Sequence, residues 1–310
     1  MSSKDTFFAR LYLPHAGGIR EVLIMKYVQD LDCYRSIDGT ICRVFPWSSP
    51  SDYHLSQSST GRERFIDLVN HSISESKKGL LKKVVLSRVE LIERKKDPEN
   101  IVHELAESHR HGLVYHLKHP LFGEWMGATP ELLFSRNGNE FETMALAGTL
   151  PAKSAQAWST KLLEEHHYVV EDLLDAFRKQ GVVNARKTGP NERLAGTIKH
   201  LETRFTFQST ASDDVWRQQL HPTSAICGSP KKLATQWISQ NESHERRLYC
   251  GLIGIEWTDR SAYYVNLRCA QVFDTHYELF AGVGLTESSD PKEEWEETER
   301  KLDTIRSAVE

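Results

Sequence analysis

Apolar residues recur at helical spacing along several stretches of the chain. The clearest stretch is 159–180, where five apolar side chains form one stripe: Leu163, Val170, Leu173, Leu174 and Phe177. Similar spacing predicts helices over 62–79, 100–109, 212–220, 229–240 and 290–309. The first of these ends at Gly79 and the last begins at Asp290-Pro291, which are typical stop and start signals.

Short apolar or alternating runs between turn residues predict strands. These runs cover 21–27, 83–92, 113–118, 121–127, 131–135, 140–146, 249–257, 262–272 and 276–283. Residues 182–207 also alternate and are interrupted by Gly189-Pro190, whereas 46–61, rich in Ser and Pro, is expected to be a loop. Hairpin-like series dominate without regular βαβ alternation, so the pattern predicts an α+β fold with antiparallel sheets.

Composition narrows the setting of this fold. The 310 residues are 39% apolar and 26% charged, which is typical of a globular protein with a sizeable core. No apolar run reaches 18 residues, and the formal net charge of −4 comes from interspersed signs, so we expect neither a membrane span nor a nucleic-acid partner. Residues 1–10 lack the apolar region of a secretory signal. Five cysteines without C-x-x-C spacing are expected to be buried thiols in a reducing cytoplasm.

Two segments place an ionisable residue beside an apolar run. Lys83 leads into KVVLSR, and Glu131 lies between Pro130 and a pair of leucines in GATPELL. Taken alone, each residue is more simply a solvated strand end or an exposed turn residue. The functional alternative is a partly buried lysine that accepts a proton near neutral pH, and a glutamic acid that an apolar setting keeps protonated.

Carboxylates on two predicted helices indicate a site for a hard cation. Glu165 lies on the apolar side of its helix, where an unpaired carboxylate would be costly. Glu294, Glu297 and Lys301 share one helix face because they are spaced by three and four residues. A third carboxylate beside the two on that face would suit Mg²⁺, which keeps waters and recruits substrate oxygens.

Other segments offer groups that could bind an anion. Arg268 interrupts an otherwise apolar strand, and a buried arginine needs an anionic partner such as a carboxylate. Gly282 and Gly284 could present backbone N–H groups, although a lone G-x-G is weak evidence. The small turn Ala147-Gly148-Thr149 would let the backbone approach a ligand, and taken alone it is simply a tight turn.

Together these segments resemble the chorismate-utilising enzymes, which include isochorismate, salicylate, anthranilate and aminodeoxychorismate synthases. The matching pieces are KVVLSR, GATPELL, ETMALAGT, EEHHYVVEDL, LHPTSAICGSP, ERRLYCGLIG, NLRCA, LFAGVGL and SDPKEEWEETERK. They occur in the family's order. The resemblance implies two antiparallel sheets packed face to face with helices outside. It also implies one chorismate-binding domain over 1–310, with a catalytic region at 80–305 and a variable, N-terminally shortened part at 1–79.

The resemblance further implies a reaction. Relatives that use water have lysine at the Lys83 position, whereas relatives that use ammonia have glutamine. Ala147 stands where aminodeoxychorismate synthases have a nucleophilic lysine, and HPTSA is close to the HPTPA of isochorismate and salicylate synthases, with Ser224 in place of proline. The implied activity is isochorismate synthase, an isomerase that adds water to chorismate and removes the C4 hydroxyl with Mg²⁺ as cofactor.

Residue roles carry over from the family position by position. Lys83 would activate the water, and Glu131 would protonate the departing hydroxyl. The implied substrate-binding residues are Ala147, Gly148, Thr149, His221, Tyr249, Arg268, Gly282, Gly284 and Lys301. The implied metal residues are Glu165, Glu294 and Glu297, whereas Leu162 departs from the acidic residue of many relatives.

Alternatives stay open at this point. A salicylate synthase would use the same residues and then eliminate pyruvate, and a non-catalytic chorismate-binding protein could share the scaffold. Lys83 argues against an anthranilate synthase, so no amidotransferase subunit is expected. Isochorismate could serve menaquinone or siderophore synthesis, and we expect a monomer, as for many relatives of this subgroup.

Overall fold

The computed structural model describes residues 7–14, 20–48, 56, 58–195 and 198–310. Its α-helices are α1 (Arg62–Lys77), α2 (Pro98–Ser108), α3 (Thr160–Lys179), α4 (Asp213–Leu220), α5 (Lys231–Asn241) and α6 (Pro291–Val309). The strands up to the middle of the chain are β1 (Phe8–Pro14), β2 (Arg20–Val28), β3 (Cys33–Arg35), β4 (Ile41–Phe45), β5 (Lys83–Glu93), β6 (Leu113–His119), β7 (Gly123–Thr129), β8 (Leu132–Asn137) and β9 (Glu140–Pro151). The later strands are β10 (Arg186–Ala195), β11 (Ile198–Gln208), β12 (Gly228–Ser229), β13 (Leu252–Glu256), β14 (Arg260–Val265), β15 (Cys269–Val272) and β16 (His276–Leu285).

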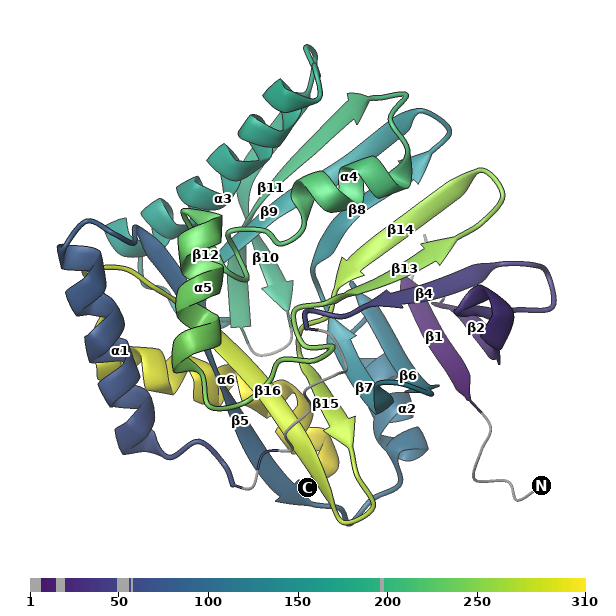
Figure 1. Cartoon of the computed structure of the whole chain (residues 1–310), viewed down its shortest axis with the longest axis horizontal. Helices are drawn as coiled ribbons and strands as arrows, with labels where there is room; N and C mark the ends of the chain where they lie inside the picture. Colours follow the sequence, from purple (N-terminus) through teal and green to yellow (C-terminus); the bar gives the residue numbers. More distant parts are fainter. Residues whose placement is uncertain (1–6, 15–19, 49–55, 57, 196–197) are drawn as a thin grey trace.

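The strands form one continuous antiparallel ladder (Figure 1). Its order is β10-β11-β9-β8-β14-β13-β4-β3-β2-β1-β6-β7-β15-β16-β5-β12. The antiparallel α+β class is therefore confirmed, and the two expected sheets are joined edge to edge into a single hydrogen-bonded series. Strands β1 to β4 make the join, because β4 pairs with β13 and β1 pairs with β6.

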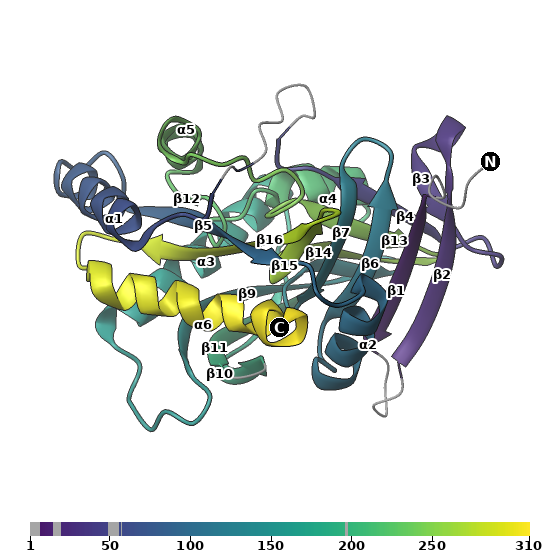
Figure 2. The same ribbon diagram turned by 90° about the horizontal axis from the view of Figure 1, so that it is seen from below.

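The main core draws residues from strands along most of this ladder and from α3 and α4. One cluster of buried residues combines Tyr34 of β3, Tyr115 of β6, Phe205 of β11 and Leu173 of α3. Helix α3 packs on β9, while α6 runs alongside β16 and contacts α1 and α2 (Figure 2). The first turns of α3 and α6, which are far apart in sequence, also meet, because Lys161 contacts Glu294.

Local pattern and caps explain why the helices match their predicted ranges. The Ser159 side chain accepts a hydrogen bond from the Leu162 N–H, and the Asp290 side chain caps α6 ahead of Pro291. Strands β1, β3, β4 and β12 were not predicted, and the expected strand over 262–272 is two strands, β14 and β15. Half of the predicted loop over 46–61, namely 49–55 and 57, lies outside the described residues.

Two smaller expectations can be compared with the structure. All five cysteines are buried, as expected of structural thiols. Among the described residues, the helices are too short or too polar for any of them to span a bilayer.

Candidate active site

One pocket gathers most of the predicted site residues. Ten of the fourteen line it, namely Glu131, Ala147, Gly148, Thr149, Glu165, Tyr249, Arg268, Gly282, Gly284 and Lys301. They come from β9, β16, α3, α6 and the segments before β8, β13 and β15. The other four do not line the pocket, namely Lys83, His221, Glu294 and Glu297. The first, second and fourth of these contact lining residues, which are Glu165, Cys250 and Lys301. Glu294 contacts Lys161.

Lys83 and Glu165 form a buried ion pair at one end of the pocket. The Lys83 side chain is fully buried, and its Nζ lies 3.2 Å from Oε1 of Glu165. Gly284 leaves the room for this pair, because a Cβ there would lie 2.1 Å from Glu165 Oε1 and 2.7 Å from Lys83 Cε. The expected role of Gly284 as an N–H donor is therefore joined by a clearer one, which is to leave space for two side chains.

Glu131 provides a carboxyl group beside three cationic side chains. It is 6% exposed and lies between β7 and β8. Burial raises its pKa to about 7, and the nearby charges of Lys83, Lys301 and Arg268 limit the rise. A substantial fraction of this group is therefore protonated at neutral pH, in agreement with the apolar setting predicted from GATPELL.

Arg268 lies where the chain leaves β14 and enters β15. Its backbone is left-handed, with φ of 48°, and its carbonyl accepts a hydrogen bond from Ala128 N–H at 2.9 Å. Burial lowers the pKa of Arg268 to about 10, so the guanidinium stays charged at neutral pH. Its Nη1 is buried and has no hydrogen-bond partner among the described residues, which leaves a donor available for an anion.

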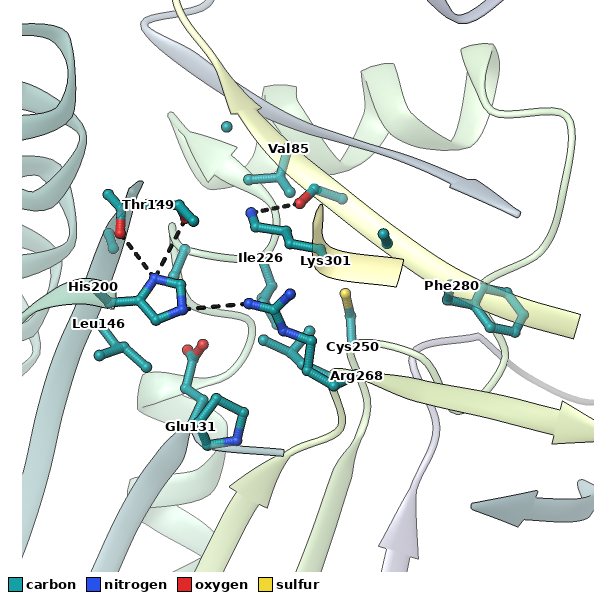
Figure 3. Close-up of a pocket in the computed structure, with 18 of the residues that line it drawn as sticks. Val85, Glu131, Leu146, Thr149, His200, Ile226, Cys250, Arg268, Phe280 and Lys301 are labelled. Carbon is teal, nitrogen blue, oxygen red and sulfur yellow. Dashed lines mark hydrogen bonds between the residues drawn. The ribbon is translucent and has the colours of Figure 1, made fainter. Parts of the chain in front are cut away.

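His200 is a pocket residue that sequence reasoning missed (Figure 3). Burial, with the charges of Arg268 and Lys301, lowers its pKa to about 3, so the imidazole is neutral. Its Nδ1–H donates to the Gly148 carbonyl at 2.8 Å, and its Nε2 accepts from Arg268 Nη2 at 3.3 Å. The sequence did contain a signal, because the alternation of apolar residues changes phase between Ile198 and Leu201. The structure has a register shift at this point, between His200 and Leu201.

His221 is not among the residues that line the pocket. Its Nε2–H donates to the Cys250 carbonyl at 2.8 Å, and its role in substrate binding stays a prediction. Burial lowers its pKa to about 4, so it is neutral. His221 therefore supports the backbone beside Tyr249, whose ring does line the pocket.

The three predicted metal carboxylates each pair with a lysine. Lys83 pairs with Glu165, Lys301 contacts Glu297 at 2.7 Å, and Lys161 contacts Glu294. In the described part of the chain, no three His, Cys, Asp or Glu side chains converge as a complete ligand set.

The chemistry of Glu294 and Glu297 nevertheless fits a hard cation. Glu294 is 1% exposed, and its Oε2 is buried without a hydrogen-bond partner among the described residues. Burial and the nearby Glu297 raise the pKa of Glu294, whereas Lys301 and Lys161 hold the pKa of Glu297 low against its burial. A cation that kept waters and recruited a substrate carboxylate could complete such a site.

Comparison with known proteins agrees with this geometry. The family model of the chorismate binding enzymes matches residues 45–310. The chain belongs to this family.

Relatives of the chorismate-binding family include named isochorismate synthases. The chain is 32% identical over 265 residues to isochorismate synthase MenF of Escherichia coli, covering 81% of this chain and 60% of that protein. It is 30% identical over 198 residues to isochorismate synthase EntC of the same organism, covering 59% and 50%. The chain thus spans about half to three-fifths of the length of these curated relatives.

A solved structure supports the same family fold. The crystal structure of a putative 2,3-dihydroxybenzoate-specific isochorismate synthase, DhbC from Bacillus anthracis, superposes with a TM-score of 0.76 at 26% identity. The match covers 98% of this chain and 84% of that one. The expected family resemblance is therefore confirmed over nearly the whole chain.

Proposed function

We propose that this protein is an isochorismate synthase. The observation that carries the proposal is the placement of Lys83 and Glu131 about one pocket that also contains the buried guanidinium of Arg268. A base and a protonated acid beside an anion-binding group suit an exchange of hydroxyl groups on an anionic ring. We further propose that 1–310 acts as one chorismate-binding domain in the cytoplasm, as a monomer without an amidotransferase subunit.

The reaction adds a hydroxyl group from water at one ring carbon and removes the C4 hydroxyl group at another. A carboxylate of chorismate binds the guanidinium of Arg268, with Lys301 and Tyr249 beside it. Lys83, in the deprotonated form reached after its proton passes to solvent, removes a proton from the attacking water, which forms the new C–O bond as the ring double bond shifts. Glu131 gives its proton to the departing C4 hydroxyl, which leaves as water. The proton on Lys83 then returns to Glu131 through solvent, so atoms and charge balance over one turnover.

Glu165 and Glu297, with Glu294 close by, are the residues that would hold Mg²⁺. The ion would supply positive charge against a substrate carboxylate. The lysine contacts of these carboxylates keep them in place for that role.

Product identification tests the proposal. Purified protein is incubated with chorismate and Mg²⁺, with and without ammonium, and the products are separated by chromatography. We expect isochorismate alone, lost when EDTA is added. Salicylate with equimolar pyruvate would assign the runner-up activity, an aminated product would contradict the role of Lys83, and absence of any product would favour a chorismate-binding protein.

Two variants connect this assay to the site. A positioned acid or base typically contributes about 10²–10⁴-fold to the rate. Lys83→Gln and Glu131→Gln should therefore each lose nearly all turnover. Glu164→Gln is the matched control, because Glu164 is exposed on the same helix as Glu165. Retention of more than half of the wild-type rate by either site variant would remove its assigned role.

A further inference from the structure

Lys161 was not among the predicted site residues, yet it reaches the carboxylates of the proposed cation site. It lies in the first turn of α3, four residues before Glu165, so both side chains share one helix face. Its Nζ donates to Oε1 of Glu294 on α6. The Lys161 side chain is 19% exposed and that of Glu294 is 2% exposed, so this ion pair is shielded from water.

The ammonium of Lys161 acts on more than one carboxylate. Its burial would by itself lower the pKa of Lys161, but the charges of Glu294, Glu165 and Glu297 together raise it. These are the same three carboxylates that the sequence assigned to Mg²⁺. A single positive charge on a flexible side chain is therefore already positioned where a divalent cation would be attracted.

The contact between Lys161 and Glu294 uses only one carboxylate oxygen. The other, Oε2, is buried and has no hydrogen-bond partner among the described residues. A buried carboxylate with an unmatched oxygen is costly, and a hard cation would relieve that cost. The ammonium of Lys161 and a divalent cation would repel each other strongly if both were bound within this one carboxylate cluster.

We propose that Lys161 is a built-in counter-ion that holds Glu294 in the metal-free protein and moves away from it when a divalent cation binds. The inference rests on the cation site of the proposed function and deepens it. Lys161 is a positioning residue here, because it acts through Glu294. Without metal, the positive charge of Lys161 offsets the repulsion between the buried carboxylates. Because it must be displaced, Lys161 also lowers the affinity of the site for the cation.

Lysine acylation followed by mass spectrometry tests the movement directly in the wild-type protein. The acylation rate of Lys161 is measured at pH 8.5 with and without Mg²⁺ and without chorismate. We expect Mg²⁺ to increase this rate severalfold, whereas the side chain of Lys95, which is 69% exposed, should react equally in both states. An unchanged or slower reaction of Lys161 with Mg²⁺ would overturn the proposal.

A variant separates a counter-ion from a simple helix-to-helix salt bridge. Lys161→Met should lower the melting temperature without Mg²⁺, and Mg²⁺ should raise it by more than in the wild type. Calorimetry should give a Mg²⁺ Kd that is about tenfold lower, within the usual range of coupling between two binding events. Lys153→Met is the matched control, because Lys153 is exposed in the loop before α3. An equal loss of melting temperature with and without Mg²⁺, together with an unchanged Kd, would show a fixed salt bridge instead.

These measurements are independent of turnover. A protein that binds Mg²⁺ as described but makes no isochorismate would retain the counter-ion and lose the proposed reaction. A protein that makes isochorismate while Lys161 stays insensitive to Mg²⁺ would retain the reaction and lose the counter-ion.

Discussion

Replacing Glu131 by glutamine should stabilise the fold at alkaline pH while removing turnover. The folded pKa of Glu131 is about 7, against an ordinary value of 4.5. One pKa unit corresponds to 1.36 kcal/mol, so ionised Glu131 costs the folded state about 3 kcal/mol relative to the unfolded chain. The cost is absent below the unfolded pKa, grows as the pH rises towards the folded pKa, and stays constant above it. Glutamine carries no charge at any of these pH values and removes this dependence.

Urea denaturation at pH 5 and pH 8.5 measures this effect. Any pH-independent change in packing or hydrogen bonding caused by the amide is present at both pH values. The quantity of interest is therefore the difference between the two stability changes. Part of the cost is already present at pH 5, so we expect Glu131→Gln to gain about 2.5 kcal/mol relative to wild type on going from pH 5 to pH 8.5. Glu164→Gln, at an exposed position, should show no such gain. A Glu131→Gln variant whose relative stability does not rise with pH would refute the raised pKa and the acid role built on it.

Three further outcomes follow from the pocket. Turnover should fall as the pH rises above about 7, because the protonated form of Glu131 is the acid; a rate that keeps rising to pH 9 in a pH–rate profile would contradict this. Gly284→Ala places a Cβ against the Lys83–Glu165 pair, so we expect at least a tenfold loss of kcat with a lower melting temperature, as for other overpacked sites; near-normal kinetics would mean that the pair is not needed in this position. Arg268→Lys keeps the charge but loses the fork of N–H donors, so KM for chorismate should rise about tenfold or more with a smaller change in kcat; an unchanged KM would place the substrate carboxylate elsewhere.

Much of the fold could be predicted from local pattern. Helices α3 and α6 carry an apolar stripe between recognisable caps, so their ranges follow from the sequence within a residue or two. Strand β1 was missed because it is only seven residues long and depends on pairing with β2 and β6, which the local pattern does not indicate. The break at Arg268 was missed because a left-handed arginine has no local signature, and the mostly apolar residues on both sides of it indicated one strand.

The candidate site shows the same division. Ten of the residues predicted from the family segments line one pocket. They could be predicted because each segment contains its functional residues within a short local motif. His200 and Lys161 act through residues that are 52 and 133 positions away, and such pairs are set by packing alone. The contact of His221 with the Cys250 carbonyl is also set by packing, and the role of His221 in substrate binding stays a prediction.

Strands β1 to β4 occupy the middle of the ladder, although they come from the part of the chain about which the sequence said least. They connect β13 to β6, because β4 pairs with β13 and β1 pairs with β6. A chain that began at residue 45, where the family match starts, would leave both of those strands with unpaired edges. Open edges invite pairing with other molecules. The segment that contributes no residue to the pocket therefore has a structural role, which is to pair two strand edges that would otherwise be open.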